Sequence, residues 1–162
     1  MRTAADAADR PYTYILCAFK CYLDIQSTSS ILGPLLDHLS TDTSIVLLQN
    51  GIGIEDELLD TLRERGLTNP VISGCAWVDS TMVDGGRAVR QHGNERLVLG
   101  YHTPRGSDVK AQFDESKAQA ALNALCTLLR TGGANIESAN IDAARWRKVL
   151  WYVYFHLHLE AL

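Results

Sequence analysis

Three short apolar runs alternate with helical patterns in the first half of the chain. The runs cover residues 12–19, 44–48 and 71–78 and are almost continuous in apolar side chains. Such runs are typical of strands that are buried on both faces of a parallel sheet. Residues 25–39 and 54–65, which lie between the runs, carry apolar side chains at helical spacing. The order strand, helix, strand, helix, strand predicts a parallel sheet with right-handed crossovers.

Individual residues predict where some of these elements end. Gly33-Pro34 should break or restart the first helix, because proline lacks an amide donor and clashes with the preceding turn. Gly66 should end the second helix. Residues 1–11 are rich in alanine and aspartate and have no apolar run, so we expect a disordered leader there.

The second half of the chain has a different pattern. Gly85-Gly86 and Gly93-Asn94 punctuate alternating residues, which favours antiparallel strands joined by tight turns. Residues 114–130 have the periodicity of an amphipathic helix, and Asp142 should cap a last helix. The pattern therefore predicts an α/β core followed by a largely helical segment.

Composition and charge exclude several classes of protein. The formal net charge is −4, which argues against a nucleic-acid partner. No apolar run approaches the roughly 20 residues that a membrane span requires, and we expect no secretory signal. The four cysteines lack CxxC spacing, so reduced thiols are expected and no metal site is predicted. These observations predict a cytoplasmic globular protein without a membrane partner.

Polar residues follow two of the predicted strands and suggest a ligand site. Lys20 comes directly after the first run, and Asn50 comes just after the second. Ligands of open parallel sheets bind beyond the carboxyl ends of the strands, where lysine can meet an anion and asparagine can donate and accept hydrogen bonds. A solvated loop lysine and an ordinary Asn-Gly turn are the alternatives.

One further lysine, Lys148, lies on the last predicted helix within Arg-Trp-Arg-Lys. By itself it is best interpreted as part of a basic helix face. The glycines at positions 51 and 53 do not form a dinucleotide fingerprint, and no GxGxxG occurs in the 162 residues.

Read together, these positions resemble ketopantoate reductase (2-dehydropantoate 2-reductase), the NADPH-dependent enzyme of pantothenate synthesis. The resemblance covers about residues 12–151. Three segments carry it: residues 15–20, a strand that ends in Lys20; residues 47–53, Leu-Leu-Gln-Asn-Gly-Ile-Gly; and residues 145–150, Arg-Trp-Arg-Lys-Val-Leu.

The resemblance implies a fold, a reaction and roles for three residues. It implies an α/β fold in which a partial Rossmann-type, NADP-binding domain (residues 12–104) precedes the start of an α-helical C-terminal domain (residues 112–162). NADPH would reduce the ketone of ketopantoate, a small 2-keto acid, to give pantoate. Lys148 would be the catalytic general acid and contact the substrate. Lys20 and Asn50 would bind the cofactor, and Asn50 would also bind the substrate.

The chain departs from the family's pattern in two ways. The GxGxxG phosphate loop is missing from these residues, and the family's asparagines four and eight residues after the lysine are Tyr152 and His156 here. We therefore expect a truncated chain with impaired activity. The alternative is a non-catalytic fragment that acts as an interaction module. An unpaired strand at the sheet edge would favour association, including homo-oligomers.

Overall fold

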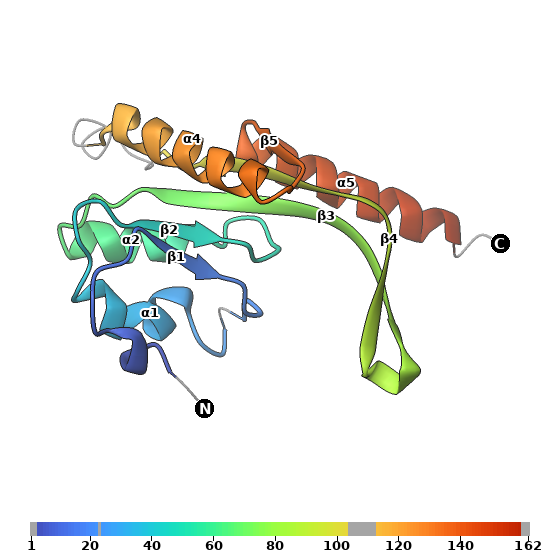
Figure 1. Ribbon diagram of the computed structural model, residues 1–162, viewed down its shortest axis with the longest axis horizontal. Coiled ribbons are helices and arrows are strands. Elements are labelled where there is room, and N and C mark those ends of the chain that lie inside the picture. Colours follow the sequence, from blue (N-terminus) through green and yellow to red (C-terminus); the bar gives the residue numbers. More distant parts are fainter. Residues whose placement is uncertain (1–2, 23, 104–112, 160–162) are drawn as a thin grey trace.

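The computed structural model describes residues 3–22, 24–103 and 113–159, which form a five-stranded sheet with helices on both faces (Figure 1). The strands are β1 (Tyr14–Cys17), β2 (Ser44–Leu47), β3 (Val71–Val83), β4 (Ala88–Tyr101) and β5 (Ile136–Ser138). They lie in the order β1-β2-β3-β4-β5. The first three are parallel, β4 is antiparallel to β3, and β5 is parallel to β4. The predicted α/β fold with its parallel strands is confirmed.

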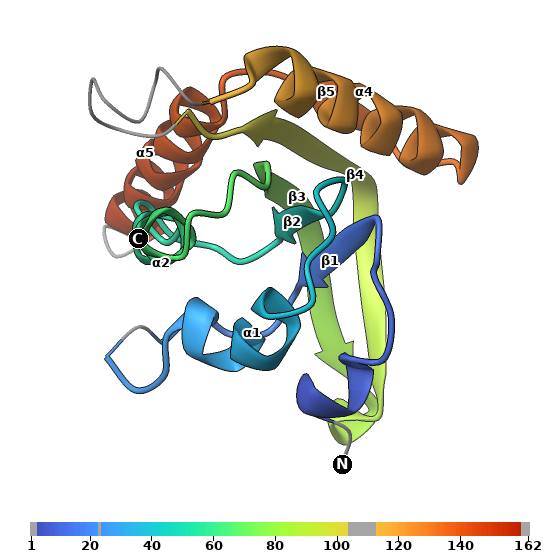
Figure 2. The same cartoon turned by 90° about the vertical axis from the view of Figure 1, so that its left-hand side faces the viewer.

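The α-helices of the described residues that cover the sheet are α1 (Thr28–Leu36), α2 (Asp56–Glu64), α4 (Glu115–Thr131) and α5 (Ile141–Leu159). Figure 2 shows α1 and α2 on one side of the sheet and α4 on the other. The two faces have separate cores, which are centred on Ile45 and Leu58 under α1 and α2, and on Ile72 and Leu122 under α4. The first turn of α5 packs on β3 and β4 through Ile141 and Ala144. Within the described residues, no helix is long and apolar enough to cross a membrane.

The end of α2 follows the sequence prediction. Gly66 has φ +67°, a value that favours glycine. Its amide donates to the carbonyl of Arg63, and the Leu67 amide donates to the carbonyl of Leu62. These two bonds make a Schellman motif, which satisfies carbonyls that the helix end would leave unpaired.

The predicted burial of the first strand is wrong. β1 is only four residues long, and the Leu16 side chain is 54% exposed. On that face α4 reaches Tyr14, whose hydroxyl donates to the carbonyl of Ala121 at 3.0 Å. At the position of Leu16 the same face is left open, so this strand is not buried on both faces.

Two predicted breaks and one cap also differ from the structure. The helix α1 continues through Gly33-Pro34, because Pro34 lies two residues from its end and removes a single backbone bond. The strand β4 continues through Gly93, where the pairing with β3 shifts register in a β-bulge. The turn predicted at Gly85-Gly86 is confirmed, since the chain reverses at Asp84–Gly86. Asn140, rather than Asp142, caps α5, since its Oδ1 accepts from the amide of Ala143 at 2.9 Å.

The N-terminal residues have more structure than we expected. Ala5–Ala7 form a short 3₁₀ helix, and Ala4, Ala7 and Ala8 pack against the core beneath α1. Small apolar side chains provide this contact although they form no apolar run. The expected domain division at residues 104–112 lies outside the described residues and stays a prediction.

Candidate functional site

A cleft of about 240 Å³ lies where the loop after β2 meets β3 and α5. It therefore lies beyond the carboxyl end of β2 and beside the first half of β3, at one of the two strand ends that the sequence singled out. The residues around it are Gln49, Asn50, Gly51, Ile52, Gly74, Cys75, Arg145, Lys148, Val149 and Tyr152. Two of the three site residues that we predicted, Asn50 and Lys148, are among them.

Glycine shapes the loop that carries Asn50. Gly51 has φ +135° and Gly53 has φ +71°, and both values favour glycine over residues with a Cβ. A side chain at position 51 would also collide with Ile54, which is buried in the core. The Gln-Asn-Gly-Ile-Gly sequence thus turns the chain tightly between β2 and α2, and Asn50 lies at the mouth of the cleft.

The amine of Lys148 is held between this loop and β3. Its Nζ donates to Oδ1 of Asn50 at 2.9 Å and to the carbonyl of Ala76 at 2.6 Å. The ring of Tyr152 lies 5.8 Å from the same Nζ. Half-burial lowers the pKa of the Lys148 ammonium below its ordinary value, although the nearby Cys75 opposes the shift. A lowered pKa makes this ammonium a better proton donor than an exposed lysine.

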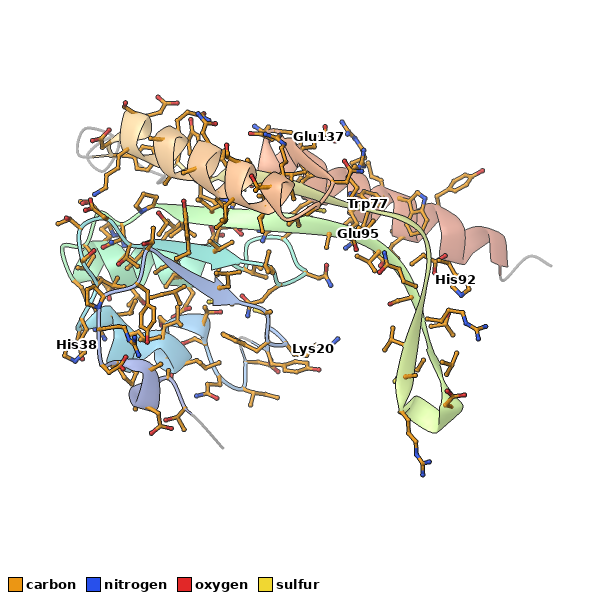
Figure 3. The ribbon with its side chains drawn as sticks, in the orientation of Figure 1. Lys20, His38, Trp77, His92, Glu95 and Glu137 are labelled. Carbon is orange, nitrogen blue, oxygen red and sulfur yellow. The ribbon has the colours of Figure 1, made fainter. Side chains whose placement is uncertain are left out.

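Lys20 lies apart from this pair. It is exposed on the loop that follows β1, and its side chain points outward from that loop (Figure 3). The cleft lining contains neither Lys20 nor any other residue of that loop. Lys20 therefore lies at the strand end where the sequence placed it, but it does not contact Asn50 or Lys148. The side chain of His156 lies outside the described part of α5.

A buried polar network next to the cleft could not be predicted from the sequence. Arg145 donates to Oε2 of Glu55 at 2.5 Å and to Oγ of Ser73 at 3.0 Å. Nε2 of His102 lies 2.8 Å from the same Ser73 oxygen. All four side chains are buried, and they come from α5, the start of α2, β3 and the end of β4. The only sequence signal was Arg145 within the Arg-Trp-Arg-Lys segment.

This network supplies partners for a cluster of side chains that could otherwise hold a metal ion. Glu55, His102 and Asp142 place possible ligand atoms within 4.8 Å of one another. However, Arg145 already pairs with Glu55, and both carboxylates lie at helix N-termini, where the helix dipole is positive. A metal cation at this position would be repelled by the guanidinium of Arg145 and by the positive ends of the two helix dipoles. We therefore interpret the cluster as an ion-pair network that joins α2 to α5.

Burial also changes the acidity of two neighbouring groups. It lowers the pKa of His102, although the Glu55 carboxylate opposes the shift, so the imidazole resists protonation. It raises the pKa of the Cys75 thiol on the cleft wall, against the effect of Lys148. Cys75 is one of four free cysteines. A raised pKa keeps its thiol protonated and weakly nucleophilic.

Comparisons with known proteins identify the family of this chain. Residues 1–104 match the family model described as ketopantoate reductase PanE/ApbA. An uncharacterized protein of Saccharomyces cerevisiae is 29% identical over 160 aligned residues, which cover 91% of this chain and 42% of that protein.

Some solved structures have a similar fold. The 2-dehydropantoate 2-reductase of Geobacter metallireducens superposes with a TM-score of 0.65 at 24% identity, over 93% of this chain and 43% of that one. The enzyme of the same name from Methylococcus capsulatus gives 0.60 at 28% identity, over 92% and 41%. The chain thus spans about two fifths of the length of these relatives. Because the family model matches more than half of its residues, the chain belongs to the ketopantoate reductase family.

Proposed function

We propose that the cleft is the active site of an NADPH-dependent 2-dehydropantoate 2-reductase, which reduces the ketone of ketopantoate to the alcohol of pantoate. The observation that carries the proposal is the contact between Lys148 and Asn50, 2.9 Å apart, beyond the carboxyl end of β2 and beside the first half of β3. These two residues belong to different motifs and are 98 positions apart in the chain. Their contact supports the proposal that the two motifs contribute to one site.

Lys148 is the general acid in this proposal. As the ketone is reduced, negative charge develops on its oxygen, and an ammonium nearby stabilises that charge. Lys148 then donates a proton to the oxygen, which gives the alcohol and leaves a neutral amine. Its lowered pKa reduces the free energy needed for this transfer. The carbonyl of Ala76 and the amide of Asn50 orient the amine while the proton is held.

Part of the cleft fits the nicotinamide end of the cofactor, which supplies a hydride when it is bound. Both amide atoms of Gln49 are buried, and they have no hydrogen-bond partner among the described residues. A primary carboxamide offers the donor and acceptor that such an amide lacks. Asn50 presents a second amide at the cleft mouth, and Lys20 would supply positive charge toward the phosphates.

The phosphate end of the cofactor has weaker support in these residues. No GxGxxG occurs in the 162 residues, so we propose that this chain alone binds NADPH weakly and turns over slowly. We also propose that residues 12–104 form the nucleotide-binding part and residues 112–162 the start of a helical part. The family leaves room for other 2-keto acids as substrates. Free thiols favour the cytoplasm as the location.

The test is a reductase assay of two forms of the protein. The 162-residue chain and a form extended at both ends along its gene are supplied with NADPH and ketopantoate, and the loss of NADPH is followed. We expect turnover in the extended form and little in the shorter one. An extended form that binds NADPH but reduces no 2-keto acid would contradict the proposed activity and favour a non-catalytic role.

A further inference from the structure

Two basic residues of α5 contact the same pair of neighbouring elements. Arg145 donates to Glu55, at the end of the loop after β2, and to Ser73 of β3. Lys148 donates to Asn50, at the beginning of that loop, and to the Ala76 carbonyl of β3. Residues three apart lie on the same side of a helix. The two basic side chains therefore form successive bridges between one helix, one loop and one strand.

The two bridges differ in rigidity. Arg145 and Glu55 are 5% and 2% exposed, and Ser73 is fully buried. The planar guanidinium reaches both partners at once, which fixes its orientation, and His102 lies against the same Ser73 oxygen. Lys148 is half-buried on a flexible four-carbon stem. Its amine stays at the cleft only if α5 keeps its position.

Within the described residues, the packing of this part of α5 is uneven along the helix. Its first turn packs through Ile141 and Ala144, whereas Trp146 and Leu150 are exposed. Beyond Lys148, the ring of Trp151 meets Trp77 edge to face with centroids 5.7 Å apart. Trp151 is 42% exposed, and ring pairs tolerate sliding more readily than a buried arginine that donates to a carboxylate and a hydroxyl at once.

We propose that Glu55 and Arg145 are positioning residues, which hold α5 so that the Lys148 amine stays between Asn50 and Ala76. This inference rests on the proposed function for the role of Lys148. The contacts of Arg145 fix the position of α5, and this position places the amine of Lys148, the proton donor, in the cleft. A small displacement of the amine can cost about a hundredfold in rate.

The experiment measures the pKa of Lys148 directly. The chain has four lysines, so an NMR titration of protein labelled at the lysine Cε can resolve each one, and Lys148→Arg assigns the signal. The variants are Arg145→Lys, which keeps the charge but cannot bridge both partners, and the pair Glu55→Gln/Arg145→Met. The pair removes both charges, so it leaves no unpaired buried charge behind. Arg147→Met, exposed on the same helix, is the matched control.

We expect the pKa of Lys148 to rise toward its ordinary value in Arg145→Lys and in the pair, because the amine moves into solvent. The unfolding free energy of the pair should be close to that of the wild type. Ketopantoate reduction by the extended form should fall about a hundredfold in both variants and stay unchanged in Arg147→Met. If the double variant Glu55→Gln/Arg145→Met keeps the wild-type pKa of Lys148 and the wild-type rate of ketopantoate reduction, the inference is overturned. If the pKa rises but even the wild type reduces no 2-keto acid, the proposed function fails and the positioning of Lys148 stands.

Discussion

At the scale of single residues, the hydrogen bond between Lys148 and Asn50 places an uncharged acceptor beside the lysine amine. Asn50→Asp replaces a neutral acceptor with a carboxylate at 2.9 Å from Nζ. A negative charge there stabilises the ammonium, so we expect the pKa of Lys148 to rise and proton donation to weaken. The NMR titration above measures this pKa. Asn123→Asp, exposed on α4, is the control and should leave it unchanged. Equal pKa values in Asn50→Asp and the wild type would show that the two side chains do not interact in solution.

His102 gives a prediction for the pH dependence of stability. Burial lowers its pKa from the ordinary value of 6.5, so the unfolded chain takes up a proton at a higher pH than the folded chain. The free energy of unfolding should therefore fall as the pH drops through 6.5 toward the lowered pKa. Urea unfolding on both sides of this window measures the fall. It should be smaller in His102→Gln than in the wild type or in the exposed control His38→Gln. An equal fall in all three proteins would mean that the pKa of His102 is not lowered by folding.

The residues of the cleft differ in how well the sequence could predict them. Asn50 and Lys148 stand in local motifs, at a strand end and on a helix, so their neighbourhood could be inferred from the order of elements. Glu55, His102 and Arg145 could not be inferred together. Each is an ordinary polar residue in its own segment, and only the packing of α2, β4 and α5 joins them. Lys20 shows the opposite case, because its motif position was clear but the fold leaves it exposed.

At the scale of elements, Gly100 allows the connection before α5 to lie against β4. A Cβ at this position would meet the Ala139 carbonyl and lie 2.9 Å from the Ile141 Cβ. Because backbone cannot move aside cheaply, Gly100→Ala should lower the free energy of unfolding by about 1–3 kcal/mol. At Gly33, inside α1, a Cβ would have no atom within 4 Å outside the neighbouring residues and the backbone of its own helix. Because Pro34 disfavours helical backbone in a preceding residue that has a Cβ, Gly33→Ala gains little, and its free energy of unfolding should stay within about 0.5 kcal/mol of the wild type. Urea unfolding compares the two variants, and a neutral Gly100→Ala would contradict the close approach.

The elements themselves were largely predictable, but their surroundings were not. The apolar runs located β1 to β3 and their parallel order, and the periodicity located α2 and α4. Periodicity reports how a segment could be buried, not whether a partner covers it, and for that reason the exposure of Leu16 was missed. Gly93 was misassigned for a related reason. Glycine with positive φ suits both turns and bulges, and only the pairing with β3 distinguishes them.

At the scale of the whole molecule, the described sheet ends in β1, which pairs with β2 alone. A strand with an exposed apolar side chain at a sheet edge is a template for pairing with another chain. We expect the 162-residue chain to associate as its concentration rises, as measured by sedimentation velocity. Leu16→Lys should weaken association, because a charge at an edge disfavours pairing.

The control for the edge is a second exposed leucine. Leu128 on α4 is 60% exposed, and Leu16 is 54% exposed, so Leu128→Lys makes the same chemical change away from the edge. If Leu128→Lys weakens association as much as Leu16→Lys does, the copies associate through general hydrophobic contact rather than through strand pairing.

The most direct test of the whole account is the rate of NADPH-dependent ketopantoate reduction by the extended form with Lys148→Met. We expect about a 10²- to 10⁴-fold loss, because the variant removes the proton donor at the cleft. Lys117→Met, which changes a lysine on α4 that contacts the Thr41 carbonyl, should keep the wild-type rate. A Lys148→Met protein that reduces ketopantoate as fast as the wild type would contradict the assignment of Lys148 as the general acid.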